Sequence, residues 1–94
     1  MEFSTKVGTA KRIPRSRVWL EGDRLASAGF TNGARYNVQW SSTGATLMLS
    51  DTGARKVAGT IHRPVIDITG AHVRALDCDR VTVDFNHSVI TIRV

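Results

Sequence analysis

Residues 20–33 read LEGDRLASAGFTNG, and this stretch predicts a short helix followed by a tight turn. Asp23 is expected to cap the helix, because its carboxylate can accept hydrogen bonds from the backbone amides of the first turn. Leu25 lies on the apolar side of the helix, and Gly29 is typical of the residue that follows a helix C-terminus. Thr31-Asn32-Gly33 is a strong turn signal, so the chain is expected to turn there and enter the next strand.

Strands are predicted on both sides of this helix. Residues 17–20 (RVWL) are a short apolar run that suits a strand leading into it. Residues 35–40 alternate between polar and apolar side chains, which is the pattern of a half-buried strand. A turn at residues 41–44 and a return strand at residues 45–50 complete a hairpin. This part of the chain is therefore predicted as strand, short helix and hairpin.

The same order of elements is predicted a second time. Residues 64–68 (PVIDI) suit a strand, the apolar spacing over residues 71–76 suits a short helix, and residues 81–94 suit a second hairpin. Residues 51–62 (DTGARKVAGTIH) lie between the two units as a turn-rich connector. One such unit is too small to bury both of its faces, so the two are expected to pack together.

Length and composition place the chain among small globular domains. A chain of 94 residues is expected to form one domain, and its 41% hydrophobic and 22% charged residues argue against disorder for most of it. No apolar run approaches the roughly 18 residues that span a bilayer, and the first ten residues lack the apolar core of a secretory signal. The one cysteine, Cys78, cannot form an internal disulfide. These features favour the reducing cytoplasm and no membrane partner.

The positive charge is concentrated at the N-terminus. Residues 1–17 carry five basic side chains against Glu2 alone, which accounts for +4 of the net +5. Residues 1–14 show little periodicity and are predicted to be a flexible basic arm, which would be attracted to phosphate backbones or to acidic protein surfaces. The predicted domain then covers residues 15–94, divided into a first repeat (15–50), a connector (51–62) and a second repeat (63–94).

The spacing Leu20-x-Gly22-x-x-Leu25-x-x-Ala28-Gly29-Phe30-x-x-Gly33 resembles the motif of SymE-like proteins. Those are bacterial proteins associated with toxin–antitoxin systems and related to the AbrB and MazE swapped-hairpin transcription factors. The resemblance covers about residues 17–50. The chain departs from the family pattern at Arg24, where the family commonly has Trp, and in having a second unit where the family usually has a tail.

The resemblance implies a fold and a function. The fold would be an α+β arrangement of two βαββ-like repeats that interlock as a swapped-hairpin small barrel or sheet, with the flexible basic arm at its N-terminus. In the family the two units usually come from two chains, so this chain would act as a pseudo-dimer, and a homodimer is compatible with it. Relatives of this fold grip nucleic acid with basic loops and strands, in toxin–antitoxin or phage-related settings.

Catalysis has little support in the sequence. His62, His72 and His87 fall in different predicted elements, and no two of them have the spacing of metal ligands on a helix. Cys78 is flanked by aspartates, the opposite of the electropositive surroundings that activate a thiol. No phosphate-binding loop, GxSxG or CxxC motif is present. We therefore expect no catalytic residue, no cofactor and no metal site.

Binding is the expected activity, and seven basic residues are its candidates. They are Lys11, Arg12, Arg15 and Arg17 on or beside the arm, Arg35 in the first repeat, and Arg55 and Lys56 in the connector. A flexible basic loop can follow a phosphate backbone. Trp19, Tyr36 and Trp40 are candidates for stacking on bases, although alternating aromatic residues in a strand more often line the core.

A second class of function fits the same residues. A small basic protein with duplicated sheet units could be a phage-encoded inhibitor that binds and blocks a host defence nucleoprotein complex. Its basic residues would then pair with acidic side chains, and its strand edges could pair with the partner. Five Asp against six basic residues after residue 50 leave no continuous basic track there, which favours this alternative.

Overall fold

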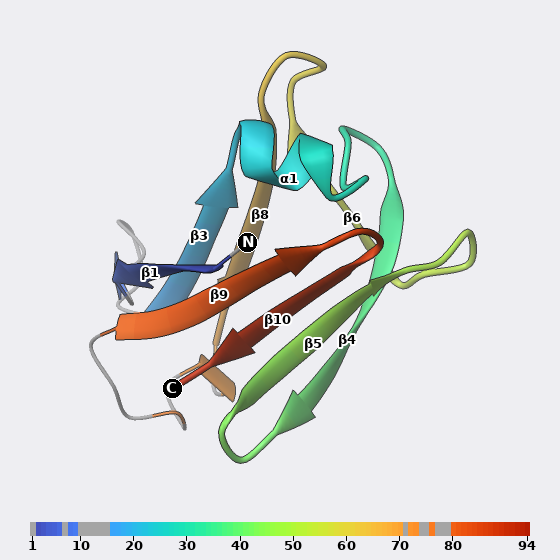
Figure 1. Cartoon of the computed structure of the whole chain (residues 1–94). Coiled ribbons are helices and arrows are strands. Elements are labelled where there is room, and N and C mark those ends of the chain that lie inside the picture. The colour runs from blue at the N-terminus through green and yellow to red at the C-terminus, as the bar shows by residue number, and fades with distance from the viewer. Residues whose placement is uncertain (1, 7, 10–15, 71, 74–75, 77–79) are drawn as a thin grey trace.

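The computed structural model describes residues 2–6, 8–9, 16–70, 72–73, 76 and 80–94 (Figure 1). These residues form two antiparallel sheets and one short helix. The larger sheet has six strands in the order β1 (Glu2–Lys6), β9 (Arg80–Asn86), β10 (Val89–Arg93), β5 (Gly44–Leu49), β4 (Arg35–Ser41) and β6 (Arg55–Lys56). The smaller sheet has four strands in the order β2 (Gly8–Thr9), β3 (Ser16–Glu21), β8 (Pro64–Thr69) and β7 (Ala58–Gly59). The predicted small, sheet-rich α+β class is confirmed, but as two open sheets and not as a closed barrel.

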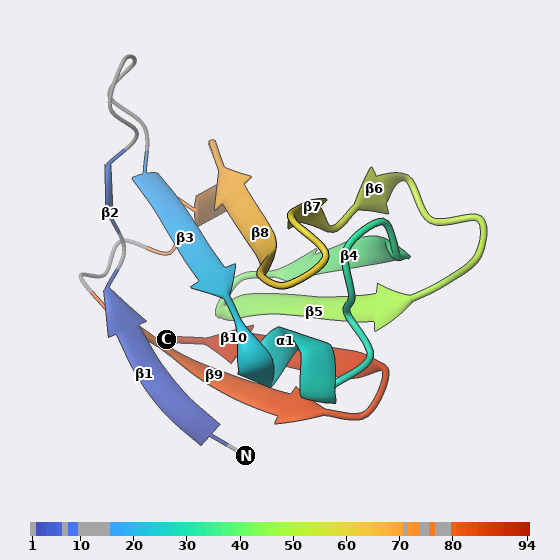
Figure 2. The ribbon, with the colours of Figure 1, turned by 90° about the horizontal axis from the view of Figure 1, so that it is seen from above.

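The core lies between the two sheets (Figures 1 and 2). Every second side chain is buried in β9 and β10, as the alternation in the sequence predicted, and β8 alternates in the same way. The fully buried side chains come from both sheets, the helix and its exit: Val18, Leu20, Leu25, Phe30, Leu47, Val57, Ile66, Ile68, Val73, Val81, Val83 and Ile90. They belong to one hydrophobic cluster, so the two predicted units do pack together.

The helix α1 (Asp23–Ser27) lies at one end of the molecule, above the ends of β3 and β8 (Figure 1). The expected side-chain cap by Asp23 is wrong, because the N-cap is Gly22 and Asp23 is the first helical residue.

Gly33 has φ of 85°, the left-handed conformation that its turn requires. None of the described helices is long and apolar enough to cross a membrane.

The expected arm at residues 1–14 is the main correction to the fold. Residues 2–6 form β1, which pairs with β9, and residues 8–9 form β2, which pairs with β3. Residues 1, 7 and 10–14 lie outside the described residues. The physical reason is the edge of β9: without β1 its backbone amides and carbonyls would have no strand partner on that side. The segment therefore belongs to both sheets.

The connector at residues 51–62 also has more structure than predicted. Arg55 and Lys56 form β6 at the edge of the six-stranded sheet, and Ala58 and Gly59 form β7 at the edge of the other. Val57, between them, is only 2% exposed. The connector therefore crosses from one sheet to the other and contributes a core residue on the way.

Candidate nucleic-acid interface

The predicted basic residues divide into three groups in the structure. Lys11, Arg12 and Arg15 lie outside the described residues. Arg17 lies in the four-stranded sheet, whereas Arg35, Arg55 and Lys56 meet at the far edge of the six-stranded sheet. The structure therefore brings Arg35 and Lys56 together on one face, places Arg55 on the opposite face of the same edge, and separates Arg17 from all three.

Arg17 is held by a neighbouring carboxylate. Its Nη2 donates to Asp67 Oδ2 at 2.7 Å and its Nε donates to Asp67 Oδ1 at 3.1 Å, a two-point ion pair. The hydrogen bond to Asp67 raises the pKa of Arg17. The guanidinium also lies 4.8 Å from the ring centre of Trp19. Because Asp67 balances its charge, Arg17 is a poor candidate for contacting a polyanion.

A second ion pair lies beside the first, between Arg63 and Glu21. Arg63 Nε donates to Glu21 Oε2 at 3.0 Å. That hydrogen bond is the main cause of the lowered pKa of Glu21, and a hydrogen bond with Trp19 lowers the same pKa further. Where the structure describes this side of the molecule, these two ion pairs balance positive against negative side chains, which gives that part little net attraction for phosphate.

The edge formed by β4 and β6 places two basic side chains next to each other. Arg35 and Lys56 are direct partners across the two strands, so their exposed side chains leave the same face of the sheet. Arg35 Nη1 donates to the carbonyl of Gly53 at 3.2 Å, which orients it. Arg55 is opposite Tyr36 and lies on the other face of the pleat, still exposed. We call the pair Arg35–Lys56 the basic edge. Like charges placed directly opposite each other in a sheet repel, so this pair is unfavourable for the folded protein.

The basic edge continues onto the outer face of the six-stranded sheet. Since the inward positions fill the core, the alternate positions face away from it. We call this surface the outer sheet face; its residues are Arg35, Asn37, Gln39 and Ser41 of β4, Thr46 and Met48 of β5, Lys56 of β6, Arg80, Thr82, Asp84 and Asn86 of β9, and Val89, Thr91 and Arg93 of β10. Among these described residues, four side chains are basic and one is acidic. The others are mostly neutral hydrogen-bonding groups.

Sequence reasoning missed Arg80 and Arg93 as members of this face. The signal was present, because both occupy the polar positions of alternating strands. What the sequence did not contain was the strand order, which sets β9 and β10 beside β5 and β4.

The aromatic candidates do not lie on the outer sheet face. Tyr36 is 3% exposed and packs edge-on against Phe30, with ring centres 5.9 Å apart. Trp40 is half-buried and stacks on His72, with ring centres 4.9 Å apart. Trp19 is 40% exposed but on the four-stranded sheet. The core interpretation is therefore confirmed for Tyr36, and among the described residues no aromatic ring forms a stacking platform on the outer sheet face.

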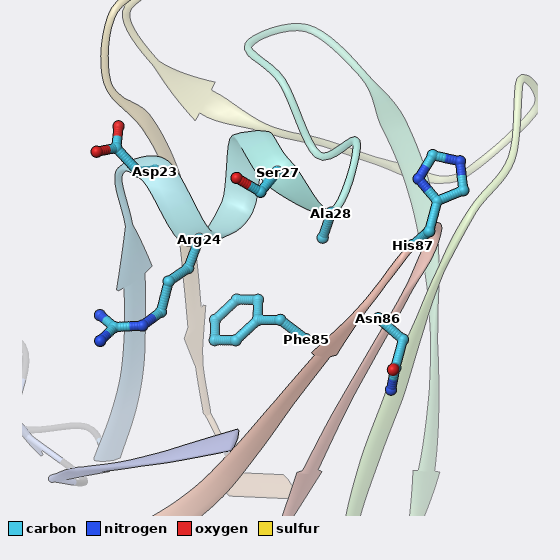
Figure 3. A pocket seen from close by; sticks show the side chains of 7 residues that line it. All are labelled: Asp23, Arg24, Ser27, Ala28, Phe85, Asn86 and His87. Carbon is cyan, nitrogen blue, oxygen red and sulfur yellow. The ribbon is translucent and has the colours of Figure 1, made fainter. Parts of the chain in front are cut away.

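A cavity of about 200 Å³ opens at the end of the sheet, between α1 and the β9–β10 hairpin (Figure 3). Its lining residues are Asp23, Arg24, Ser27 and Ala28 on the helix side and Phe85, Asn86 and His87 on the hairpin side. The backbone amide of Ser88 donates to the carbonyl of Ala28 at 2.8 Å, which ties the hairpin turn to the helix end. The sequence did not reveal this cavity, because its two sides are about 60 residues apart along the chain.

The possible metal ligands stay apart where the structure describes them. Within that part of the chain, no three His, Cys, Asp or Glu side chains gather into a group that could hold an ion. His62 and His87 are exposed. Cys78, with Asp77 and Asp79, lies outside the described residues.

Comparison with known proteins adds no relative. The chain has no significant match to any protein-family model, curated protein or solved structure.

Proposed function

We propose that this chain binds nucleic acid without catalysis, through the outer sheet face and its basic edge. The observation that carries the proposal is the pair Arg35–Lys56, two cations held directly opposite each other. Such a pair is unfavourable in the free protein, and a phosphate between the two side chains would relieve it. The hydroxyl and amide groups beside the pair suit contacts with phosphate and sugar, which position a strand without reading its sequence.

We further infer that the fold is a swapped-hairpin pseudo-dimer of the SymE and AbrB kind, acting in a toxin–antitoxin or phage-related system. The strand pairing supports a twofold relation between the halves. Trp19 and Asp67 are opposite each other at the centre of the β3–β8 pair, and Thr46 and Thr91 are opposite each other at the centre of the β5–β10 pair. An antiparallel pair centred on equivalent residues is what a twofold axis produces.

The outer strands follow the same relation. Strand β1, which precedes the first repeat, pairs with β9 of the second repeat, and β6, in the connector that precedes the second repeat, pairs with β4 of the first. In addition, β2 pairs with β3 and β7 pairs with β8. The segment before each repeat therefore adds one strand to the hairpin of the other repeat, which is the exchange expected between the subunits of a swapped dimer.

Salt titration tests the binding proposal. With about three phosphates neutralised, affinity for duplex DNA should fall roughly 40-fold between 50 and 200 mM salt, and less for single strands. Changing both residues of the basic edge, Arg35→Ala with Lys56→Ala, should reduce the slope of log K against log salt by about two. The control is Arg17→Gln with Arg63→Gln, which removes the same charge from the four-stranded sheet and should leave the slope unchanged. Equal slopes for the two double variants would remove the basic edge from the site.

The alternative function is a small phage-encoded inhibitor of a host defence complex. Two exposed apolar side chains favour it: Ile61 is 82% exposed and Trp19 is 40% exposed, and neither belongs to the outer sheet face. Exposed apolar groups of this size are more useful to a protein interface than to a phosphate backbone. If neither DNA nor RNA binds at 50 mM salt, the first proposal fails and this alternative stands.

A further inference from the structure

The outer strands of the six-stranded sheet, β1 and β6, cover their neighbours to different extents. Strand β1 is opposite residues 80–84 of β9, whereas β6 is opposite only Arg35 and Tyr36 of β4. Among the described residues, no strand lies beside β4 on this side from residue 38 to its end (Figure 1). We call residues 38–41 of β4 the open edge.

The backbone of the open edge carries hydrogen-bonding groups that point away from β5. The amide of Ser50 donates to the carbonyl of Arg35 at 3.0 Å, so Arg35 and every second residue after it in β4 bond toward β5. The amides and carbonyls of Val38 and Trp40, at the alternate positions, therefore point to the side on which no described strand lies. Backbone groups of this kind are a template for an added strand.

The side chains of the open edge are also less covered than their counterparts in the other hairpin. Val38 and Val83 are equivalent, because each is the hairpin partner of the residue that follows the central threonine. Val83, which is opposite Phe3 of β1, is fully buried, whereas Val38 is half-buried. Trp40 is half-buried as well. Apolar side chains on an added strand would complete the burial of both.

The connector does not cover the open edge. Arg35 Nη1 donates to the carbonyl of Gly53 at 3.2 Å, and the amide of Ala54 donates to Asn37 Oδ1 at 3.0 Å, so these residues are held as a turn beside β4. A Cβ at Gly53 would lie 2.5 Å from the amide nitrogen of Tyr36, which shows how closely the turn packs on the strand. The connector therefore begins to pair with β4 only after this turn.

The surroundings of the open edge indicate the chemistry of a matching strand. A strand added antiparallel to β4 would follow the line of β6 and end at the turn. Its residues opposite Val38 and Trp40 would face the core side, so both should be apolar. Its residue opposite Asn37 would lie on the outer sheet face, near Arg35 and in line with Lys56. Because these two side chains are basic and exposed, an acidic residue fits there.

A second copy of β4 fits this edge less well than a free segment does. An antiparallel pair of two open edges, with Val38 opposite Trp40 of the second copy, would bring residues 42–43 of that copy opposite Tyr36 and Arg35. Strand β6 already occupies those positions. A segment that ends before them avoids the overlap.

We propose that the open edge binds an extended segment of a partner protein as an antiparallel strand. The segment would carry two apolar residues at alternate positions, followed by an acidic residue. The backbone of Val38 and Trp40 would supply the hydrogen bonds, and the basic edge would select the acidic end. This inference goes beyond nucleic-acid binding, and because the basic edge is common to both, its tests use no nucleic acid.

Hydrogen exchange of the free protein tests whether the edge is open. The amide of Val83 points to β1, whereas the equivalent amide of Val38, and that of Trp40, face no described strand. Relative to unfolded-peptide rates, exchange followed by NMR should be roughly tenfold or more faster at Val38 and Trp40 than at Val83. Equal protection of Val38 and Val83 would show that the edge is covered and would overturn the inference.

The probe for binding is the peptide Ac-TVTFE-NH2, in which V would lie opposite Trp40, F opposite Val38 and E opposite Asn37. Titration should protect the amides of Val38 and Trp40 from exchange, with a Kd on the order of 0.1–1 mM. Methylation of the amide nitrogen of F, which points to β4, should weaken binding roughly tenfold or more. The matched control is methylation of the amide nitrogen of the second T, which points away from β4 and should change the Kd less than about twofold.

Three results would overturn the inference. The first is unchanged exchange at Val38 and Trp40 in saturating peptide. The second is an equal Kd for the two methylated peptides, because strand pairing depends on which amide is blocked. The third is a concentration-dependent dimer of the free protein that protects the same two amides, which would assign the open edge to a second copy.

A change of charge tests the acidic end of the segment. The peptide Ac-TVTFK-NH2 should bind the wild-type protein about fivefold more weakly than Ac-TVTFE-NH2 at about 20 mM salt. Arg35→Gln with Lys56→Gln should abolish this preference. The control, Arg17→Gln with Arg63→Gln, removes the same charge from the four-stranded sheet and should keep it. A preference that survives in the basic-edge variant would overturn the assignment of an acidic residue to this position.

Discussion

Lys56→Glu should stabilise the protein while it weakens binding of nucleic acid. Lys56 stands directly opposite Arg35, and both side chains are exposed. Cross-strand charge pairs contribute roughly 0.2–1 kcal/mol, and exposure to solvent keeps such values low. Replacing repulsion by attraction should therefore raise the free energy of unfolding by about 0.5 kcal/mol, which is about 2–4 °C in Tm for a domain of this size.

The assay is thermal unfolding by circular dichroism at about 20 mM and 1 M salt, with Lys56→Gln as the neutral intermediate. At low salt the Tm should rise from wild type through Lys56→Gln to Lys56→Glu. At 1 M salt, where the Debye length is about 3 Å, the differences should shrink. Nucleic-acid affinity should fall in the same order, with the salt slope reduced by about one. A low-salt Tm that falls in Lys56→Glu, or affinity that does not change, would refute the reasoning about the basic edge.

Two further predictions concern the fold. Gly33→Val should destabilise the protein by about 1–3 kcal/mol, because a β-branched residue is strained at φ of 85°. No atom lies within 4 Å of the added Cβ, so the cause would be the backbone and not a clash. Gly33→Asn should lose less free energy of unfolding in urea, and equal urea midpoints for the two variants would contradict a backbone cause. Burial raises the pKa of Tyr36, so the folded state keeps the phenol proton to higher pH than the unfolded state does. The free energy of unfolding should therefore fall as pH rises above about 10, by at most about 1.4 kcal/mol per pH unit from this one group. Tyr36→Phe should remove that part of the alkaline loss, and an identical pH profile for the variant would exclude Tyr36 as its source.

Local patterns in the sequence predicted most of the elements. The alternation over residues 35–40 and 81–85 placed β4 and β9 with their buried faces correctly, because the side chains of a strand alternate whatever its neighbours are. The glycine at position 33 marked its turn for a similar reason, since the steric cost of positive φ acts within one residue. The prediction that Asp23 caps the helix was wrong, because Gly22 occupies the N-cap position.

The candidate site was only partly predictable. Arg35 was selected from its charge in the first repeat, and Arg55 and Lys56 from their charge in the glycine-bearing connector; Arg35 and Lys56 do lie opposite each other, but Arg55 lies on the other face. Arg17 was selected by the same criteria, but Asp67 binds it across the sheet. No local signal separates these cases, because a carboxylate 50 residues away decides the outcome.

By itself, the sequence determined the longer strands of the two predicted units (β3, β4, β5, β8, β9 and β10), the helix α1, the turn at Gly33 and which side chains are apolar enough to be buried, since these depend on neighbours within a few residues. Only the tertiary structure decided that residues 2–6 pair with β9, that the connector bridges both sheets, and that the outer sheet face and the cavity exist. Strand pairing is made by backbone amides and carbonyls, which every residue except proline carries alike, so the choice of partner depends on how the whole chain closes over its core.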